Sequence, residues 1–321
     1  AVVTLAPEAA PPGAPAGELF RGEPGLAVQS DGAWGLNPVL RGLRKESIVV
    51  LVDGVRLNSA QPQGAIASML DAGLLDRIEV VKGPSSVLHG SGAMGGVVNL
   101  LTPKPRFSDT RYLGGRFSLG ASSVDKGLSG ALLVEHGGPE HALVIGAAAR
   151  RASDYDSPDG RVDHTGFHSD SLLARYSHRL GRDASVWLNL QRHADHDVWY
   201  PGSARTGGQP GGAGIPPLLG TVTLHSPEQS RELYEIGIEG DLGGGRASAE
   251  LYRQEVFRQI RAWTANLGRD YVRNDVTFVT DGVRATYRLP VGDRHLLTFG
   301  AEHWDMRARP ERYIDNNPPR F

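Results

Sequence analysis

The chain has 321 residues, and its 34 basic and 36 acidic side chains give a formal net charge of −2. This balance argues against a nucleic-acid-binding protein, which usually presents a strongly basic face. The absence of cysteine excludes a disulfide framework, thiolate metal ligands and a cysteine nucleophile. No run reaches the ~18 apolar residues of a membrane-spanning helix, whereas a membrane β-barrel is compatible with the sequence because its strands carry a weaker signal.

Residues 1–17 begin with a short apolar stretch, Val2-Val3-Thr4, and continue as Ala/Pro-rich sequence without periodicity. The prolines at positions 7, 11, 12 and 15 cannot continue a helix or donate main-chain hydrogen bonds. This composition predicts an extended tether.

Residues 18–105 have a mixed α/β pattern. Residues 48–52 form a continuous apolar run, typical of a strand buried on both faces, and the turn dipeptide Asp53-Gly54 predicts a hairpin. Apolar residues at helical spacing predict a helix over residues 65–75. Residues 78–81 and 97–101 are β-branched runs that predict two further strands, so this segment is expected to form a compact α+β domain.

Residues 106–321 alternate apolar and polar side chains with the period of two that is typical of half-buried strands. Tight turns and long loops alternate between these strands, which in an up-and-down meander places all tight turns at one end. This is the pattern of an outer-membrane barrel, although a soluble antiparallel sandwich is the alternative. About nine strands are expected, and an odd number cannot close an all-antiparallel barrel. The predicted strands lie near residues 112–121, 128–136, 141–150, 171–179, 185–193, 232–241, 246–263, 277–289 and 296–304.

Four segments of residues 18–105 resemble the plug of the TonB-dependent receptors of bacterial outer membranes. They are VLRGL at 39–43, LVDGVRLN at 51–58, IEVVKGPSS at 78–86 and GSGAMGGVVN at 90–99, in the family's order. The resemblance implies that a plug domain fills an antiparallel transmembrane β-barrel. Complete barrels of this kind have roughly 22 strands, so the barrel part of this chain is expected to be incomplete.

The same resemblance assigns roles to individual residues. It implies that Val2, Val3 and Thr4 form a TonB box, the segment that pairs with the TonB energy-transducing complex in the periplasm. It also implies plug–barrel ion pairs at Arg41, Glu79 and Lys82, and a plug apex that contacts ligand at Gln61 and Gln63.

Two loops on the predicted long-loop side are rich in aspartate and histidine. Asp154, Asp156 and Asp159 offer hard oxygen ligands that suit calcium, although their spacing departs from that of an EF-hand. The imidazoles of the two loops could bind a transition metal or ligate heme iron, and simple solvation is the alternative. The residues predicted to bind ligand here are His164, His168, His196 and Tyr200.

These observations predict TonB-dependent import of a metal-containing ligand (heme, a siderophore, cobalamin or a metal ion) across the bacterial outer membrane. The expected partners are the TonB complex, outer-membrane lipid and the ligand, and no nucleic acid. We expect no enzymatic activity and no required cofactor; a Gly90-x-Gly92-x-x-Gly95 motif precedes a strand and not the helix that dinucleotide binding needs. Two alternatives stay open: a passive porin or surface-binding receptor on the same barrel, and a soluble β-sandwich enzyme.

Overall fold

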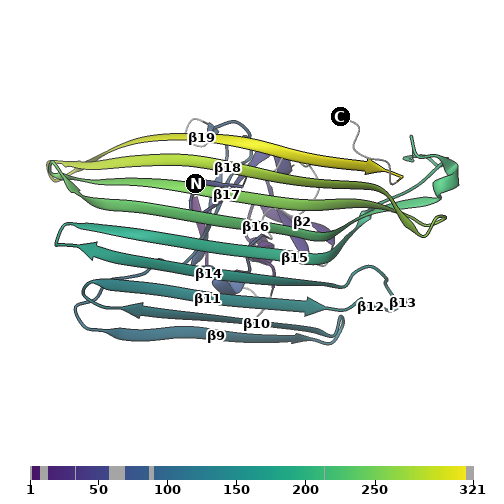
Figure 1. Ribbon diagram of the computed structural model, residues 1–321, viewed down its shortest axis with the longest axis horizontal. Helices are drawn as coiled ribbons and strands as arrows, with labels where there is room; N and C mark the ends of the chain where they lie inside the picture. Colours follow the sequence, from purple (N-terminus) through teal and green to yellow (C-terminus); the bar gives the residue numbers. More distant parts are fainter. Residues whose placement is uncertain are drawn as a thin grey trace.

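The computed structural model describes residues 2–7, 14–32, 34–57, 69–86, 90–212 and 214–315. A small unit built from the residues before position 105, which we call the plug, lies against one face of a large antiparallel sheet of nine strands (Figure 1). The predicted plug and the predicted set of nine alternating strands are both confirmed.

The plug is organised around a five-stranded sheet with the strand order β1-β7-β8-β5-β6. Strands β5 and β8 pair in parallel, and the other neighbours pair antiparallel. The described residues of the unit also contain a three-stranded sheet and three short 3-10 helices. Their bounds are β1 Val2–Leu5, η2 Ala16–Phe20, β2 Leu26–Gly32, β3 Gly35–Leu40, β4 Leu43–Arg44, η3 Lys45–Ser47, β5 Ile48–Val52, β6 Val55–Arg56, η5 Ala72–Leu74, β7 Arg77–Lys82 and β8 Gly96–Leu101.

Strand β5 is buried at every position, as its unbroken apolar run predicts. Its even-numbered residues belong to the main core, whereas Val49 and Leu51 pack with Val97 on the other side of the sheet. The predicted hairpin with β6 is confirmed. The helix predicted over residues 65–75 is not confirmed: residues 65–68 lie outside the described residues, and the part that follows contains only the 3-10 turn η5.

The prediction of an extended tether over residues 1–17 needs correction at both of its ends. Val2–Leu5 is strand β1, which pairs antiparallel with β7 at the edge of the plug sheet. Ala16 and Gly17 are buried in η2. Apolar side chains explain both results, because Val3 and Leu5 pack against the main core and Ala16 belongs to it.

The large sheet is an up-and-down meander in which each strand pairs with its neighbours in the chain. A short hairpin of β12 (Asp156–Ser157) and β13 (Gly160–Arg161) sits in one of the long loops. The strands of the sheet are β9 Tyr112–Ser122, β10 Gly127–Gly137, β11 His141–Ala152, β14 Phe167–Leu180, β15 Ala184–Thr206, β16 Thr221–Leu242, β17 Gly245–Thr264, β18 Arg269–Val291 and β19 His295–Ile314. In the described part of the chain β9 and β19 are edge strands, so the sheet does not close.

Strands β15, β16, β18 and β19 extend well beyond their predicted ends on the long-loop side. The predicted strand at residues 185–193, for example, continues to Thr206. Register shifts between Tyr200 and Arg205, and between His225 and Gln229, interrupt the alternation of side chains. Since period-two alternation is the signal for a strand, these irregularities weaken the signal in the long-loop parts of β15 and β16, whereas β18 and β19 pair without a register shift.

The two faces of the large sheet differ in character. On β14, Leu173 and Arg175 are buried towards the plug, whereas Leu172 and Tyr176 are 53% and 39% exposed on the outer face. The exposed positions of the neighbouring strands are also apolar over the half nearest the tight turns. These outer side chains include Leu188, Leu190, Ile236, Ile238, Leu251, Val283 and Phe299.

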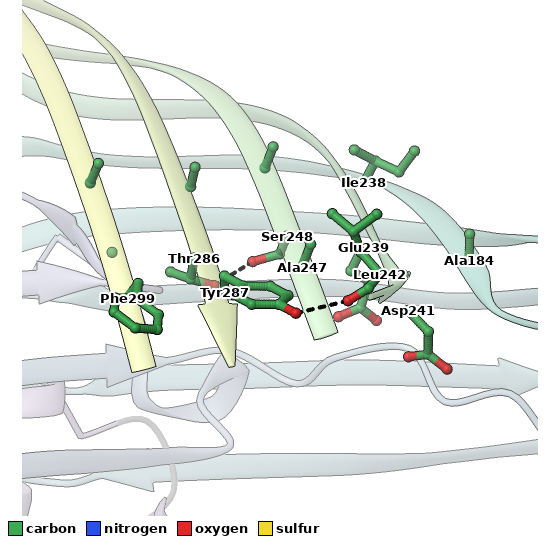
Figure 2. A pocket seen from close by; sticks show the side chains of 15 residues that line it. Ala184, Ile238, Glu239, Asp241, Leu242, Ala247, Ser248, Thr286, Tyr287 and Phe299 are labelled. Atoms are coloured by element: carbon green, nitrogen blue, oxygen red, sulfur yellow. Dashed lines mark hydrogen bonds between the residues drawn. The ribbon is translucent and has the colours of Figure 1, made fainter. Parts of the chain in front are cut away.

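An apolar groove of about 670 Å³ crosses this outer face near the tight turns (Figure 2). Alanines such as Ala247 lie between larger side chains, with Ile238 and Leu242 on one side and Tyr287 and Phe299 on the other. The Tyr287 hydroxyl donates to the carbonyl of Leu242 at 2.9 Å, so its polar end is already satisfied. The surface of the groove is mainly apolar, with Asp241 among the polar residues at its edge.

One apolar core runs without a break from the plug into the large sheet. Leu74, Ile78 and Leu100 of the plug belong to the same buried cluster as Leu133 and Leu173 of the sheet. The plug is therefore held by apolar packing as well as by polar contacts. None of the helices within the described ranges has the length and apolar character needed to span a membrane.

Candidate functional site

A buried ion pair joins the plug to the large sheet. The carboxylate of Asp53, in the turn between β5 and β6, lies 3.2 Å from Nη1 of Arg175 on β14, and both side chains are almost fully buried. The same carboxylate accepts hydrogen bonds from the main-chain N–H and hydroxyl of Thr102 and from the side-chain amide of Gln191 on β15. A charged group of the plug is thus tied to two strands of the sheet.

These partners decide the charge state of Asp53. Burial alone would raise the pKa of its carboxyl, but the Arg175 charge and the hydrogen bonds from Thr102 and Gln191 outweigh burial, so the pKa lies below its usual value. The ionised form is therefore the one that the folded protein favours at neutral pH.

A pH dependence of stability follows from this shift. Because the folded-state pKa is depressed, the stabilising contribution of Asp53 is present above its unfolded pKa and is lost as the pH falls through the folded value. We expect the free energy of unfolding to be insensitive to this group from pH 7 to about 5 and to fall in more acidic solution. Denaturant titrations of the parent and of Asp53→Asn across this range check it; an equal acid dependence in both would contradict the assignment.

Most other polar contacts between sheet and plug end on plug carbonyl oxygens. Arg231 donates to Met69 at 3.1 Å, Gln254 donates to Arg56 at 2.7 Å, and Arg284 donates to Gly54 at 3.0 Å. Arg116 donates to the carbonyls of Gly73 and Leu75, and Arg175 to that of Thr102. Main-chain acceptors are present whatever the plug side chains are, so these donors fix the position of the plug backbone.

A polar cavity of about 300 Å³ lies below this interface, towards the tight turns. Asp53 and Arg175 reach it from one end, and Lys104 of the segment that leaves the plug, Glu235 and Arg288 line the rest. Charges of both signs surround the space, which is the character expected of a hydrated lumen.

Towards the long loops, the plug-facing side of the sheet carries a buried chain of hydrogen bonds. Ser171 and the Nδ1 of His193 are 2.7 Å apart, the Nε2 of His193 is 3.1 Å from Asp195, and Gln229 donates to Asp195 at 2.8 Å. The chain reaches Tyr200, whose hydroxyl donates to Gln229 at 3.3 Å. This network links β14, β15 and β16 beside the part of the plug that is nearest the long loops.

Tyr200 is the predicted ligand residue that faces the plug. Its ring meets the ring of Trp34 edge-on, with 5.4 Å between centroids, and the Trp34 indole donates to the carbonyl of Trp199 at 3.0 Å. The plug segment at Trp34 and the long end of β15 therefore form one packed unit.

The predicted histidines lie at the same end but on the outer face of the sheet. His168 is seven residues before the plug-facing Arg175 on β14, and strand alternation places it on the opposite side. His196 pairs with His168 in register, and their rings stack with centroids 4.5 Å apart. The structure thus separates these two histidines from Tyr200 by the thickness of the sheet.

His164 belongs to a second aromatic stack on that outer face. The rings of His164 and His225 both stack on the ring of Trp199, at centroid distances of 3.9 and 4.4 Å. The Nε2 of His225 is also 2.7 Å from a carboxylate oxygen of Asp270. Because Val198 and Tyr200 pack towards Trp34, alternation points Trp199 away from the plug. The stack joins the loop before β14 to the long ends of β15 and β16.

The acidic loop residues do not gather into a metal site. Asp154 accepts hydrogen bonds from the N–H groups of Thr165 and Gly166, both at 2.8 Å, and contacts Arg161 at 3.3 Å. Burial would raise its pKa, but these partners lower the pKa further than burial raises it. Within the described ranges no group of three or more His, Cys, Asp or Glu side chains could hold a metal ion, so the calcium site predicted at Asp154, Asp156 and Asp159 gains no support.

The ion pairs predicted at Arg41, Glu79 and Lys82 are not formed with the nine strands. Glu79 pairs with Arg77 at 2.9 Å and Lys82 with Glu23 at 3.1 Å, both inside the plug. Arg41 is exposed after β3 in a left-handed conformation, with φ of 52°. Gln61 and Gln63 lie outside the described residues.

Asp53 and Arg175 were missed as partners by sequence reasoning, although two signals pointed at them. Asp53 directly follows a fully buried apolar strand, where an ionised acid needs a partner. Arg175 occupies the buried face of β14, between Leu173 and Ser177. Alternation identifies the face of each residue but not the residue opposite it.

Residues 8–97 match the family model described as TonB-dependent Receptor Plug Domain. A hemin receptor of Yersinia pestis is 40% identical to the chain over 321 residues, covering 95% of this chain and 44% of that protein. The vitamin B12 transporter BtuB of Vibrio vulnificus strain CMCP6 is 30% identical over 174 residues, covering 52% of this chain and 27% of that protein. The chain thus spans less than half the length of these relatives.

Solved structures with the same fold include the copper transporter OprC, with a TM-score of 0.75 and 19% identity over 97% of this chain and 47% of that one. A ferric enterobactin receptor of Pseudomonas aeruginosa has a TM-score of 0.71 and 17% identity, over 96% of this chain and 49% of that one. At these identities the likeness concerns the fold: a plug held against a wall of antiparallel strands.

Proposed function

We propose, because this chain belongs to the TonB-dependent receptors, that it forms the plug and one part of the pore wall of an energy-coupled importer in the bacterial outer membrane. The cargo is a metal-containing ligand, and iron porphyrin is the member of that class that we favour. The hemin receptor is similar over 95% of this chain, whereas the vitamin B12 transporter is similar over 52%.

The position of β1 is the observation that carries the proposal of energy coupling. Residues Val2–Leu5, which contain the sequence that resembles a TonB box, form the outermost strand of the plug sheet, and in the described part of the chain β7 is the one strand they pair with. A partner that binds by adding a strand can compete for such a segment through its main chain alone. Pulling on β1 would then act directly on β7, the strand next to the plug core.

A membrane location fits the outer face of the large sheet. Leu251, Val283 and Ile238 are 59%, 41% and 47% exposed, an arrangement that costs free energy in water and none in hydrocarbon. Towards the long loops on the same face, Arg253 and Asp281 form an ion pair, and we take this pair as the end of the apolar band. We place the apolar groove of Figure 2 in the half of the membrane nearest the tight turns.

A passive porin is the rival function on the same fold. The polar cavity beneath the plug would suit it, but the buried contacts of Asp53 and the shared apolar core keep the plug in place. A closed plug needs work to move it, which favours coupling to an energy source. Of the predicted ligand residues, Tyr200 is the one we retain on the cargo path, since it faces the plug.

Growth on a defined metal source tests this function. Iron-starved cells that produce the receptor should grow on hemin as sole iron source, and cells lacking it should not. Matched cultures supplied with copper or cobalamin distinguish the other cargo classes. Equal growth on hemin with and without the receptor would contradict the proposal.

A further inference from the structure

Arg231 is a buried guanidinium without an ionic partner among the residues that the structure describes. It lies on the plug-facing side of β16 and has no exposed surface. Its Nε donates to the carbonyl of Met69 at 3.1 Å and its Nη2 donates to the side-chain carbonyl of Gln191 at 2.9 Å, but its Nη1 has no acceptor. A buried charge that is not neutralised is costly, so its presence calls for an explanation.

The other arginines of the interface show that ion pairing was available there. Arg175 pairs with Asp53, and Arg284 pairs with Glu250. Asp53 and Glu235 are close enough to act on Arg231 electrostatically, yet Asp53 is held by Arg175 and Glu235 by Asn189. The two carboxylates that act on Arg231 are thus engaged elsewhere.

A second unused group lies beside Arg231. Gln254 on β17 is fully buried, its amide donates to the carbonyl of Arg56 at 2.7 Å, and its own side-chain oxygen has no donor. Register pairs Leu233 with Gln254, and Arg231 with Val256, which makes Gln254 and Arg231 diagonal neighbours on one face. A buried donor without an acceptor and a buried acceptor without a donor therefore lie on the same face of two neighbouring strands.

In the plug, the carbonyl of Met69 accepts from Arg231 and the carbonyl of Arg56 accepts from Gln254. If that part of the plug moves, Arg231 loses its main-chain acceptor at Nε and then has donors at Nε and Nη1 for an incoming anion. Guanidinium groups bind carboxylates with strong, oriented hydrogen bonds. Gln254 can accept a hydrogen bond from a neighbouring hydroxyl, amide or water of the same cargo.

We propose that Arg231, assisted by Gln254, is a carboxylate-binding site on the translocation path, covered in the resting state and exposed when the plug moves. This inference rests on the proposed import function and adds the chemistry of the cargo: a metal chelate with at least one free carboxylate. The residue acts during passage and not in the first capture of cargo at the long loops.

The probe is iron protoporphyrin with free carboxylates, compared with its dimethyl ester, in cells that produce the receptor. Arg231→Gln should slow the energised uptake of the free acid by about tenfold, a typical loss for one charge-assisted hydrogen bond, and should leave the uptake of the ester within about twofold. Surface binding by de-energised cells should be unchanged for both compounds. Arg231→Lys should retain part of the free-acid rate.

Two further variants keep the test independent of folding. Gln254→Glu supplies Arg231 with a carboxylate of similar size but removes the amide that donates to the Arg56 carbonyl, so its folding is checked first by denaturant unfolding; the folded variant should slow the free acid selectively. Arg192→Gln removes an arginine of the outer face, which contacts Asp170 and Glu232, and should change neither rate. The proposal is overturned if Arg231→Gln slows both compounds equally or neither. Failure of the parent to import either compound would instead contradict the proposed function itself.

Discussion

A receptor that carries Val3→Pro should bind iron porphyrin as the parent does but import it on the order of 100-fold more slowly. Proline has no N–H, so it removes a main-chain donor from any strand pairing at this position, and a loss of about 100-fold corresponds to about 2.7 kcal/mol of pairing with the partner. Val3 is opposite Val80 in the pairing of β1 with β7, so a proline here damages the segment that the energy-transducing partner would take up. Initial uptake rates and surface binding, measured in parallel, give the result.

Ala6→Pro is the matched control, because residue 6 follows directly on β1 and lies outside the strand. Its uptake should stay within about twofold of the parent, since no strand pairing is lost. Equal import by Val3→Pro and the parent would mean that β1 is not the coupling segment.

Asp53→Asn should lower the free energy of unfolding by about 3–5 kcal/mol, since it leaves Arg175 buried without a counter-charge. Replacing both residues, as in Asp53→Asn with Arg175→Met, removes the uncompensated charge and should recover much of the loss. Denaturant unfolding of the detergent-solubilised protein, analysed as a double-mutant cycle, measures the coupling between the two positions.

Asp281→Asn provides the control for an exposed pair. Asp281 accepts two hydrogen bonds from Arg253, at 2.6 and 3.0 Å, on the open face of the sheet. Solvent screens such an exposed pair, so its loss should lower the free energy of unfolding much less than the loss of the buried pair. Similar losses for Asp53→Asn and Asp281→Asn would contradict a structural role for the buried pair.

The architecture could be predicted because its signals are local. The apolar run of residues 48–52, the turn at Asp53-Gly54 and the alternation in nine later segments are each contained in one short stretch of sequence. The order of tight turns and long loops then fixed the meander, which the strand pairings confirm.

The arrangement of the site could not be predicted in the same way. Asp197 adopts a left-handed conformation, with φ of 57°, where β15 changes which side chains face the plug, so the side occupied by Trp199 and Tyr200 cannot be counted from residues before it. Partner choice is equally non-local: Asp53 and Arg175 are far apart in the sequence, and alternation says only that Arg175 points inward. The free donor on Arg231 becomes visible only when all of its neighbours are known.

Uptake of iron porphyrin before and after collapse of the proton-motive force tests the central claim most directly. With the membrane de-energised, cells that produce the receptor should still bind the compound at the surface, and import should stop, because the plug is held by the shared core and the buried Asp53–Arg175 pair. Import that continues unchanged in de-energised cells would show a passive pore and contradict the account.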